Sequence, residues 1–225
     1  MIDFHSHTYF SDGCLGPAEH VRRAMVKGYT VIGITDHVDF SNIEFVFTSV
    51  MKMVRELKDC GWDIQVIPGI EITHVPAKKI GKITEQAREM GIPLVIVHGE
   101  SPVEPVEPGT NRAAIEAGVD ILAHPGLIVA EDVKLAVDKG VALELTARKG
   151  HSITNGHVAR LAMDYGADLV LDSDAHGPGD FLTPEFRSTV IKGSGLHGKF
   201  LDTLEGNIIS LSQKFLKRRD TVFNK

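Results

Sequence analysis

The chain has 225 residues, 43% of them hydrophobic and 24% charged, which is enough to bury one core the size of a single α/β barrel. Its mean hydropathy is +0.00, and without a continuous apolar run of about 18 residues it is not expected to cross a membrane. Thirty acidic against 24 basic residues give a formal charge of −6, which argues against broad, non-specific binding of nucleic acid while leaving room for a local basic patch.

The sequence shows no secretory signal, no cysteine scaffold and no linker between domains. It begins Met-Ile-Asp-Phe-His, without the basic and apolar regions of a secretory signal, so we expect a cytoplasmic protein. Cys14 and Cys60 are too few for a disulfide scaffold or a thiolate metal site. No linker, repeat or low-complexity tract interrupts the sequence, and we expect one domain over residues 1–225.

Short runs rich in Val, Ile and Leu alternate with amphipathic stretches along most of the chain. Because the runs lack polar alternation, we expect strands covered on both faces. The predicted strands are Ile2–His5, Thr30–Thr35, Ile64–Ile72, Leu94–His98, Asp120–His124, Val141–Thr146 and Asp168–Asp172. Several of the stretches between them end at a glycine, as a left-handed helix C-cap requires. The predicted helices are Ala18–Lys27, Phe45–Asp59, Ile80–Met90, Asn111–Ala117, Ala130–Lys139 and Thr154–Tyr165.

This alternation predicts a parallel sheet, either closed into a barrel or open and doubly wound. An open sheet that binds a dinucleotide would carry G-x-G-x-x-G after its first strand, whereas this chain continues with His-Ser-His-Thr-Tyr-Phe-Ser-Asp-Gly. We therefore predict an α/β fold with a TIM-like barrel of parallel strands and outer helices.

The residues from about Asp180 onward are predicted to be mainly helical, over Pro184–Ile191, Leu196–Thr203 and Gly206–Arg218. We expect these helices to pack against the barrel as its last outer helices. The basic run Lys217-Arg218-Arg219 is expected to be a solvated helix end whose charges complement the helix dipole.

A histidine or an acidic residue stands at or near the carboxyl end of every predicted strand. In a parallel barrel these ends meet on one rim, where such folds place their active sites. The residues are His5, His7 and Asp12 after the first strand, Asp36 and His37 after the second, Glu71, His98, His124 and Glu144 at the next four, and Asp174 and His176 after the last.

Taken singly, these residues have ordinary explanations, such as a turn aspartate at Asp12 or a hydrogen-bonded core histidine at His98. Six imidazoles and three carboxylates buried together would, without partners, cost roughly several kcal/mol each, and divalent cations would satisfy them. Imidazole and carboxylate without thiolate suit Zn²⁺, Mn²⁺ or Fe²⁺. Nine ligands exceed one ion, so we expect two or three ions, a bridging carboxylate, and open positions for water and substrate.

The histidines and carboxylates lie in short, spaced motifs. These are His5-Ser-His7 with Ser11-Asp12-Gly13, Thr35-Asp36-His37, Gly69-Ile70-Glu71, Val97-His98-Gly99, Ala123-His124-Pro125-Gly126 and Ser173-Asp174-Ala175-His176. Over residues 1 to about 180 they resemble the motifs of the polymerase and histidinol phosphatase (PHP) family. The resemblance implies a distorted (β/α)7 barrel that holds up to three metal ions.

The resemblance also implies a ligand scheme in which Glu71 bridges two ions and Glu144 has no ligand role. Glu144 is therefore expected to orient a neighbouring group. The implied sets are His5, His7, Glu71 and Asp174 for one ion, Glu71, His98 and His124 for the second, and Asp12, His37 and His176 for the third.

Clustered divalent ions would lower the pKa of a shared water and neutralise charge on a phosphoryl oxygen. Cations that recognise phosphate should then approach the rim, although surface ion pairs are the alternative for each of them. We predict catalytic roles for Glu71, Asp174, His176 and Arg148, and substrate contacts for Arg112, Arg148, Lys149 and His151, of which His151 could donate a proton.

The predicted function is a metal-dependent phosphatase acting on a small phosphomonoester, and the resemblance suggests histidinol phosphate as one substrate. A 3′-exonuclease or nucleotide phosphodiesterase is the alternative, followed by an amide or lactone hydrolase. A non-catalytic barrel subunit of an RNA or polymerase assembly belongs to another class, and it would be expected to lose ligands or carry a basic face. The charge of −6 and the absence of a strand combining aromatic and basic residues favour a small substrate. The loop Glu100–Thr110 is expected to shape specificity, and the oligomeric state is left open.

Overall fold

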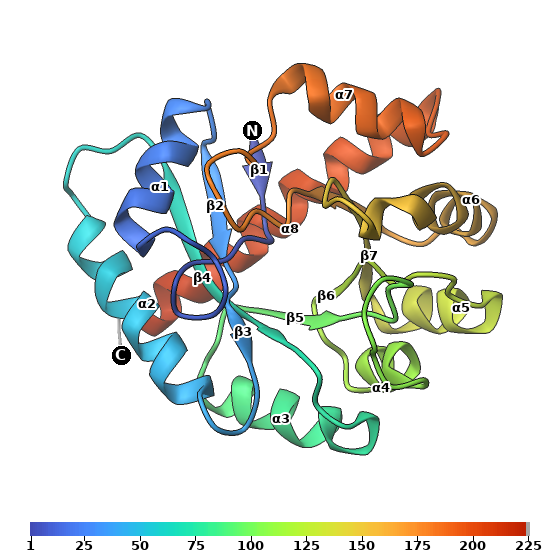
Figure 1. The fold of residues 1–225 in the computed structure, drawn as a ribbon, viewed down its shortest axis with the longest axis horizontal. Helices are drawn as coiled ribbons and strands as arrows, with labels where there is room; N and C mark the ends of the chain where they lie inside the picture. Colours follow the sequence, from blue (N-terminus) through green and yellow to red (C-terminus); the bar gives the residue numbers. More distant parts are fainter. Residues whose placement is uncertain (224–225) are drawn as a thin grey trace.

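The computed structural model describes residues 1–223 and shows a distorted barrel of parallel strands with helices around it (Figure 1). Neighbouring strands follow the order β1-β2-β4-β5-β6-β7-β8, and a short β3 pairs with β4 beside this path. The predicted barrel is confirmed. Only β3 was not expected. The strands are β1 (Ile2–Asp3), β2 (Val31–Ile34), β3 (His37–Val38), β4 (Gln65–Ile72), β5 (Leu94–His98), β6 (Ile121–Ala123), β7 (Ala142–Thr146) and β8 (Leu169–Asp172).

The helices connect successive parallel strands and form the outer layer (Figure 1). Every predicted helix up to Tyr165 has a counterpart, because their apolar residues recur at helical spacing and face the strands. Gly140 and Gly166 adopt the left-handed conformation after α5 and α6, as the sequence predicted. The helices are α1 (Pro17–Val26), α2 (Ile43–Leu57), α3 (Ala77–Glu89), α4 (Thr110–Glu116), α5 (Ala130–Lys139), α6 (Asn155–Tyr165), α7 (Pro184–Gly193) and α8 (Lys199–Phe223), with a 3₁₀ turn η1 (His151–Thr154) before α6.

The barrel closes between β1 and β8 through side chains more than through a strand ladder. Ser6 and Ala175 form an isolated parallel bridge, and the His7 backbone N–H donates to the Ala175 carbonyl at 2.8 Å. Below this bridge, the Phe4 N–H donates to the Asp172 carboxylate at 2.6 Å. The Ser173 N–H in turn donates to the Asp3 carboxylate at 3.2 Å. Because β1 is only two residues long, buried carboxylates supply the pairing that the missing ladder would have given.

The carboxyl-terminal part of the chain differs from the sequence prediction. Instead of two helices over Leu196–Thr203 and Gly206–Arg218, residues Lys199–Phe223 form the single helix α8. Gly206 does not interrupt it, since a glycine inside a helix costs only about 1 kcal/mol. The helix α7 lies where Pro184–Ile191 was predicted.

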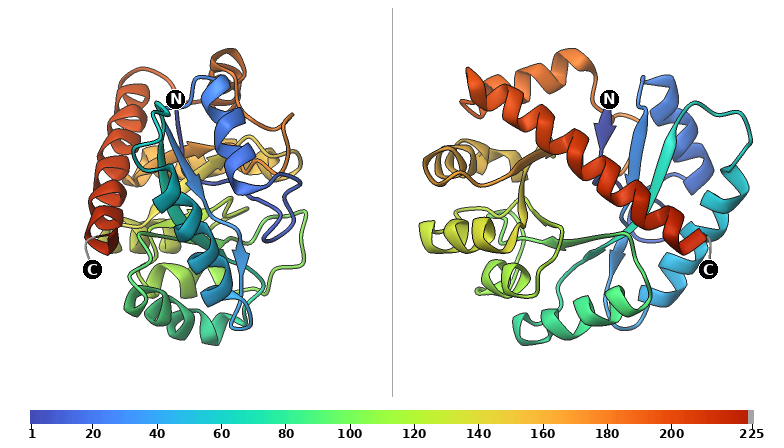
Figure 2. Two further views of the ribbon diagram at one scale, coloured as in Figure 1. Left: turned by 90° about the vertical axis from the view of Figure 1, so that its left-hand side faces the viewer. Right: turned by 180° about the vertical axis from the view of Figure 1, so that it is seen from behind.

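Helix α8 crosses the amino-terminal end of the barrel and is not one of the outer helices (Figure 2). Its Phe215 is fully buried and packs edge-to-face on Phe4, with ring centroids 5.4 Å apart. Arg218 donates to Asp120 at 2.7 Å, just before β6, and Arg219 donates to the Val66 carbonyl at 3.0 Å in β4. The expectation of a solvated basic run is therefore wrong for both arginines, which bind groups at the beginnings of strands.

Within residues 1–223, no helix is both long enough and apolar enough to span a bilayer.

Replacing Phe215 should destabilise the fold because it empties the packed end of the barrel. We expect Phe215→Ala to lower the free energy of unfolding by about 3–5 kcal/mol. As a control, Phe45, a residue that is 61% exposed, is changed to alanine, which should alter the free energy of unfolding by less than about 0.5 kcal/mol. Denaturant titration followed by circular dichroism measures both, and equal losses would contradict the sealing role of α8.

Candidate metal centre

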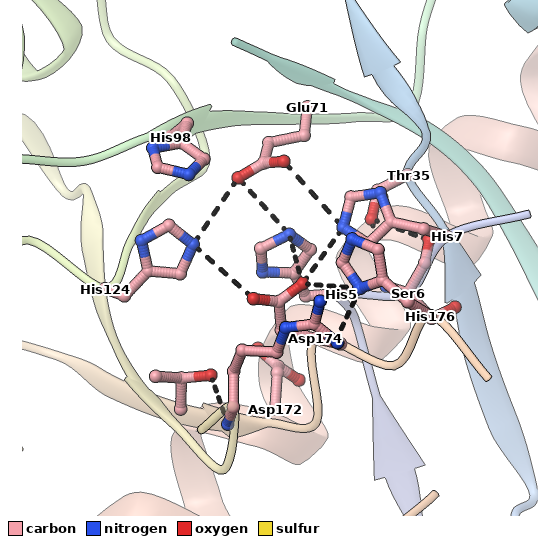
Figure 3. A network of polar contacts seen from close by, with 12 residues as sticks. His5, Ser6, His7, Thr35, Glu71, His98, His124, Asp172, Asp174 and His176 are labelled. Carbon is pink, nitrogen blue, oxygen red and sulfur yellow. Dashed lines mark hydrogen bonds and ion pairs between the residues drawn. The ribbon is translucent and has the colours of Figure 1, made fainter. Parts of the chain in front are cut away.

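The predicted histidines and carboxylates converge at the carboxyl ends of the strands, opposite α8. Figure 3 shows labelled side chains from separate strands pointing toward one another. Glu71 and His98 belong to β4 and β5. His124 follows β6 directly, and His5 lies two residues after β1. The donors brought together by ion-pair distances or clustered ligand atoms are His5, His7, Asp12, His37, Glu71, His98, His124, Asp174 and His176.

Glu71 is fully buried at the middle of this arrangement. Its Oε1 lies 3.3 Å from His5 Nε2 and 3.7 Å from His124 Nε2. Its Oε2 contacts His37 Nδ1. The unexpected strand β3 explains the last contact, because it places His37 in register with Glu71. The two oxygens thus face different imidazoles, which is the geometry that a bridging carboxylate needs.

Asp174 closes the cluster from the β8 side. Its Oδ1 lies 3.1 Å from His7 Nε2, and its Oδ2 lies 3.7 Å from His124 Nε2. Asp174 and His124 both have left-handed backbone conformations, with φ of 51° and 26°. Such conformations cost of order 1–3 kcal/mol each and gather at functional sites, where the surroundings hold them.

A second group of donors lies at the mouth of the site. Asp12 Oδ1 is 3.1 Å from His176 Nε2 and 3.4 Å from His37 Nε2. The Asp12 side chain is 56% exposed, so this group faces the solvent more than the one around Glu71. His7 joins it, because ligand atoms of all four residues lie within 4.8 Å of one another.

A third group contains a residue that the ligand scheme does not include. His98, His124 and His151 each offer a ring nitrogen within 4.8 Å of the others. Glu104, which the sequence did not single out, lies 3.1 Å from His98 Nε2 and 3.3 Å from His151 Nε2. It belongs to a loop with two further glutamates, and nothing in the sequence distinguishes the one that faces the site.

Hydrogen bonds to several imidazoles fix which ring nitrogen faces the cluster. His5 Nδ1 bonds Glu144 Oε2 at 2.8 Å, and His98 Nδ1 bonds the Gly99 carbonyl at 3.1 Å. His176 Nδ1 bonds the Asp174 carbonyl at 2.9 Å. A neutral ring that donates from Nδ1 presents its lone pair from Nε2, the form that ligates metals. Glu144 thus makes the orienting contact expected of it.

Divalent cations fit these donors, because many of the buried polar atoms have no hydrogen-bond partner. Such atoms are costly to bury, and coordinated cations would satisfy those that face the cluster. With imidazole and carboxylate but no thiolate, the set suits Zn²⁺, Mn²⁺ or Fe²⁺. The partnerless atoms include His5 Nε2, both ring nitrogens of His7, Glu71 Oε1, His124 Nδ1 and His151 Nδ1.

The protonation of these residues shows the same need for positive charge. Burial raises the pKa of Asp174 to about 7. Burial also lowers the pKa of His7 well below its usual value, which keeps this ring neutral. At His5, burial acts in the same downward direction, but the carboxylates of Glu144 and Glu71 outweigh it and raise the pKa. The raised pKa values of Asp174 and His5 show that added positive charge is favoured beside the carboxylates of the cluster.

Arg148 and Lys149 line cavities at the site. Arg148 lines a cavity of about 200 Å³ together with donors such as His98 and His176. It also lines a neighbouring cavity of about 450 Å³ with Lys149 and Phe186. Arg112, by contrast, pairs with Asp132 at 2.6 Å and lines a separate cavity beside α3 and α4. This placement argues against the predicted substrate contact of Arg112.

Comparison with known proteins places the chain among relatives of several activities. A family model described as PHP domain matches residues 3–173, more than half of the chain. The "Uncharacterized protein MJ1295" of Methanocaldococcus jannaschii is 45% identical over 218 residues, covering 96% of this chain and 99% of that protein. The "5'-3' exoribonuclease Rnm" of Escherichia coli is 29% identical over 233 residues, covering 97% and 69%. A "Probable phosphatase" of Shewanella pealeana is 28% identical over 209 residues, covering 82% of each.

Among solved structures, the chain is similar to one in the cryo-EM structure of archaeal Ribonuclease P with mature tRNA. The TM-score is 0.65 at 17% identity, over 100% of this chain and 94% of that one. At this identity the likeness shows the shared fold alone.

Glu144→Gln should weaken metal binding because it removes the negative charge that orients His5. We expect the affinity for one ion to fall about 10–100-fold, as is usual when a partner of a metal-ligating histidine is changed. Zinc titration against a chromophoric chelator measures this, with Glu116→Gln on the exposed face of α4 as the control. Unchanged affinity in Glu144→Gln would remove Glu144 from the centre.

Proposed function

Because the chain belongs to the PHP domain family, whose members are typically metal-dependent phosphoesterases, we propose that it is a phosphatase acting on a small phosphomonoester. The observation that carries this proposal is the juxtaposition of the buried donors with an arginine-lined cavity. The donors supply a site for divalent cations, and Arg148 supplies positive charge beside it.

The residues proposed to hold the ions divide as in the family scheme. His5, His7, Glu71 and Asp174 would hold one ion, with Glu71 shared by the ion at His98 and His124. Asp12, His37 and His176 would hold the third, at the mouth. When bound, such ions lower the pKa of a shared water to give a hydroxide nucleophile and neutralise charge on phosphoryl oxygens.

Arg148 is suited to grip a phosphate because it is anchored without being fully paired. Its guanidinium lies 3.4 Å from Asp180 Oδ2, and the Arg148 side chain is 30% exposed. The same Asp180 oxygen accepts the backbone N–H groups of His176 at 3.0 Å and Gly177 at 2.9 Å. Asp180 therefore holds Arg148 next to a donor of the mouth cluster, leaving guanidinium N–H groups for the substrate.

The neighbouring cavity of about 450 Å³ would take the leaving group. Its volume is in the range of small-molecule sites. Lys149 provides a second cation there, and the half-exposed ring of Phe186 provides an apolar wall. A small organic phosphate fits this combination better than a polymer, whose backbone needs an extended basic track.

A nuclease or nucleotide phosphodiesterase is the second candidate, supported by the similarity to the exoribonuclease of Escherichia coli. The same centre could position a phosphodiester, and only the leaving-group side would differ. A non-catalytic subunit is favoured less, because every donor of the family scheme is present and clustered.

A substrate panel tests the proposal directly. Chelator-treated protein is reloaded with Mn²⁺ or Zn²⁺, its metal content is measured, and hydrolysis of phosphomonoesters, phosphodiesters and an RNA oligomer is compared. We expect a preference for phosphomonoesters. Faster cleavage of RNA or of diesters would favour the second candidate, and metal-loaded protein inactive on the whole panel would favour the non-catalytic one.

Glu71→Gln should abolish turnover, since Glu71 contacts imidazoles of more than one donor group. We expect kcat to fall by more than about 100-fold, beyond the loss typical of an outer-shell partner, together with a loss of bound metal. Kinetic assay and elemental analysis on the same sample check both. Near-normal turnover with full metal content would contradict the bridging role.

Arg148→Ala should raise KM for a phosphomonoester by about tenfold or more, because hydrogen bonds between charged groups contribute roughly 1.5–3 kcal/mol. Bound metal should stay the same. The paired measurement is Arg112→Ala, which should leave KM unchanged if its contact with Asp132 is its role. If KM rises in Arg112→Ala and stays unchanged in Arg148→Ala, Arg112 and not Arg148 binds the phosphate.

A further inference from the structure

One side of the metal centre is built from residues that the family scheme leaves unassigned. His151 begins η1 and is buried, with 5% of the residue exposed. Its ring centroid lies 4.4 Å from that of His124, which is also the distance between the rings of His98 and His124. His151 is thus as close to His124 as His98 is. His98 and His124 belong to the family scheme, whereas His151 does not.

Glu104 contacts two members of the same group. Its Oε2 lies 3.1 Å from His98 Nε2, and its Oε1 lies 3.3 Å from His151 Nε2. Because His98 Nδ1 bonds the Gly99 carbonyl, a neutral His98 turns a lone pair and not an N–H toward the carboxylate. Two electron-rich atoms at this distance repel one another unless a proton or a metal cation lies between them.

Two buried ring nitrogens in this group also have no partner. These are Nδ1 of His124 and Nδ1 of His151, in residues that are only 2% and 5% exposed. A hydrogen-bonded packing role would have supplied partners for them, as it does for His157, whose Nε2 bonds the Ile128 carbonyl at 2.7 Å.

The loop that carries Glu104 is held at both ends. Glu100 Oε1 accepts the backbone N–H groups of Gly109 at 3.0 Å and Asn111 at 2.9 Å. Near the second end, Glu107 Oε2 accepts the Ala77 N–H at 2.8 Å, which ties the loop to the beginning of α3. Residues between these anchors span the site, so the position of Glu104 over the imidazoles follows from how the loop is fixed.

We propose that Glu104 and His151 are ligands of the divalent cation held by His98 and His124. With the shared Glu71, the donors of this ion become three imidazoles and two carboxylates, a set suited to Zn²⁺, Mn²⁺ or Fe²⁺. The loop 100–109 then belongs to the metal site as well as to the cavity wall. The inference replaces the substrate contact expected of His151. It rests on the metal centre of the proposed function but not on phosphoester hydrolysis.

Metal binding by matched pairs of variants tests this inference. The test variants are Glu104→Gln and His151→Ala. The controls are Glu116→Gln on the exposed face of α4 and His157→Ala, six residues beyond His151. Chelator-treated protein is titrated with Zn²⁺ and with Mn²⁺ in competition with a chromophoric chelator, and elemental analysis gives the stoichiometry. We expect each test variant to bind one ion at least about tenfold more weakly, the other ions as in the wild type, and both controls to bind normally.

Wild-type affinity and stoichiometry in both test variants would overturn the inference, as would equal weakening in Glu116→Gln. If His151→Ala does not fold, His151→Asn provides the same comparison with a polar side chain of similar size. Selective loss of one ion from the test variants, in a metal-loaded protein that hydrolyses no phosphoester, would support the inference while refuting the proposed function.

Discussion

Closure of the barrel between β1 and β8 is the constraint on which the rest of the site depends. Strand β1 has only two residues and is too short to form a ladder with β8. The two strands are joined instead by one bridge and by the carboxylates of Asp3 and Asp172. The donors His5 and His7 follow β1, on one side of this closure, and Asp174 follows β8, on the other side. The place where the sheet is least regular is therefore where the functional groups meet, and backbone strain at Asp174 belongs to the same junction.

The electrostatics of the rim follow from that closure. Residues that would be hydrated in an open sheet are packed around Glu71, where burial alone would leave several imidazole and carboxylate atoms unsatisfied. Around them stands a layer of fixed acceptors, including Glu144 and the Gly99 carbonyl, that selects the tautomer of the neighbouring rings. Because the protein's own hydrogen bonds hold these rings, the donors are oriented before a cation binds.

The sequence was sufficient for the features that depend on local pattern. Apolar runs located the strands, helical periodicity located α1 to α7, and residues next to strand ends gave the donors of the rim. It was insufficient where the outcome depends on what lies across space. Glu104 and Arg112 both belong to or follow one proline-rich loop, yet the structure turns the first toward the imidazoles and pairs the second with Asp132. Arg218 and Arg219, near the end of α8, were expected to be solvated. Their partners lie at the beginnings of strands that are distant in sequence, so neighbouring residues do not reveal them.

The position of α8 has a consequence for how such a protein can diversify. Its buried contacts at the amino-terminal end, among them Phe215 on Phe4, do not involve the loops of the opposite rim. Insertions and substitutions in those loops can therefore accumulate with little loss of stability, because the packing of α8 lies at the other end of the barrel. A lineage built on this plan is free to explore new ligands at one pole while the other keeps the architecture intact.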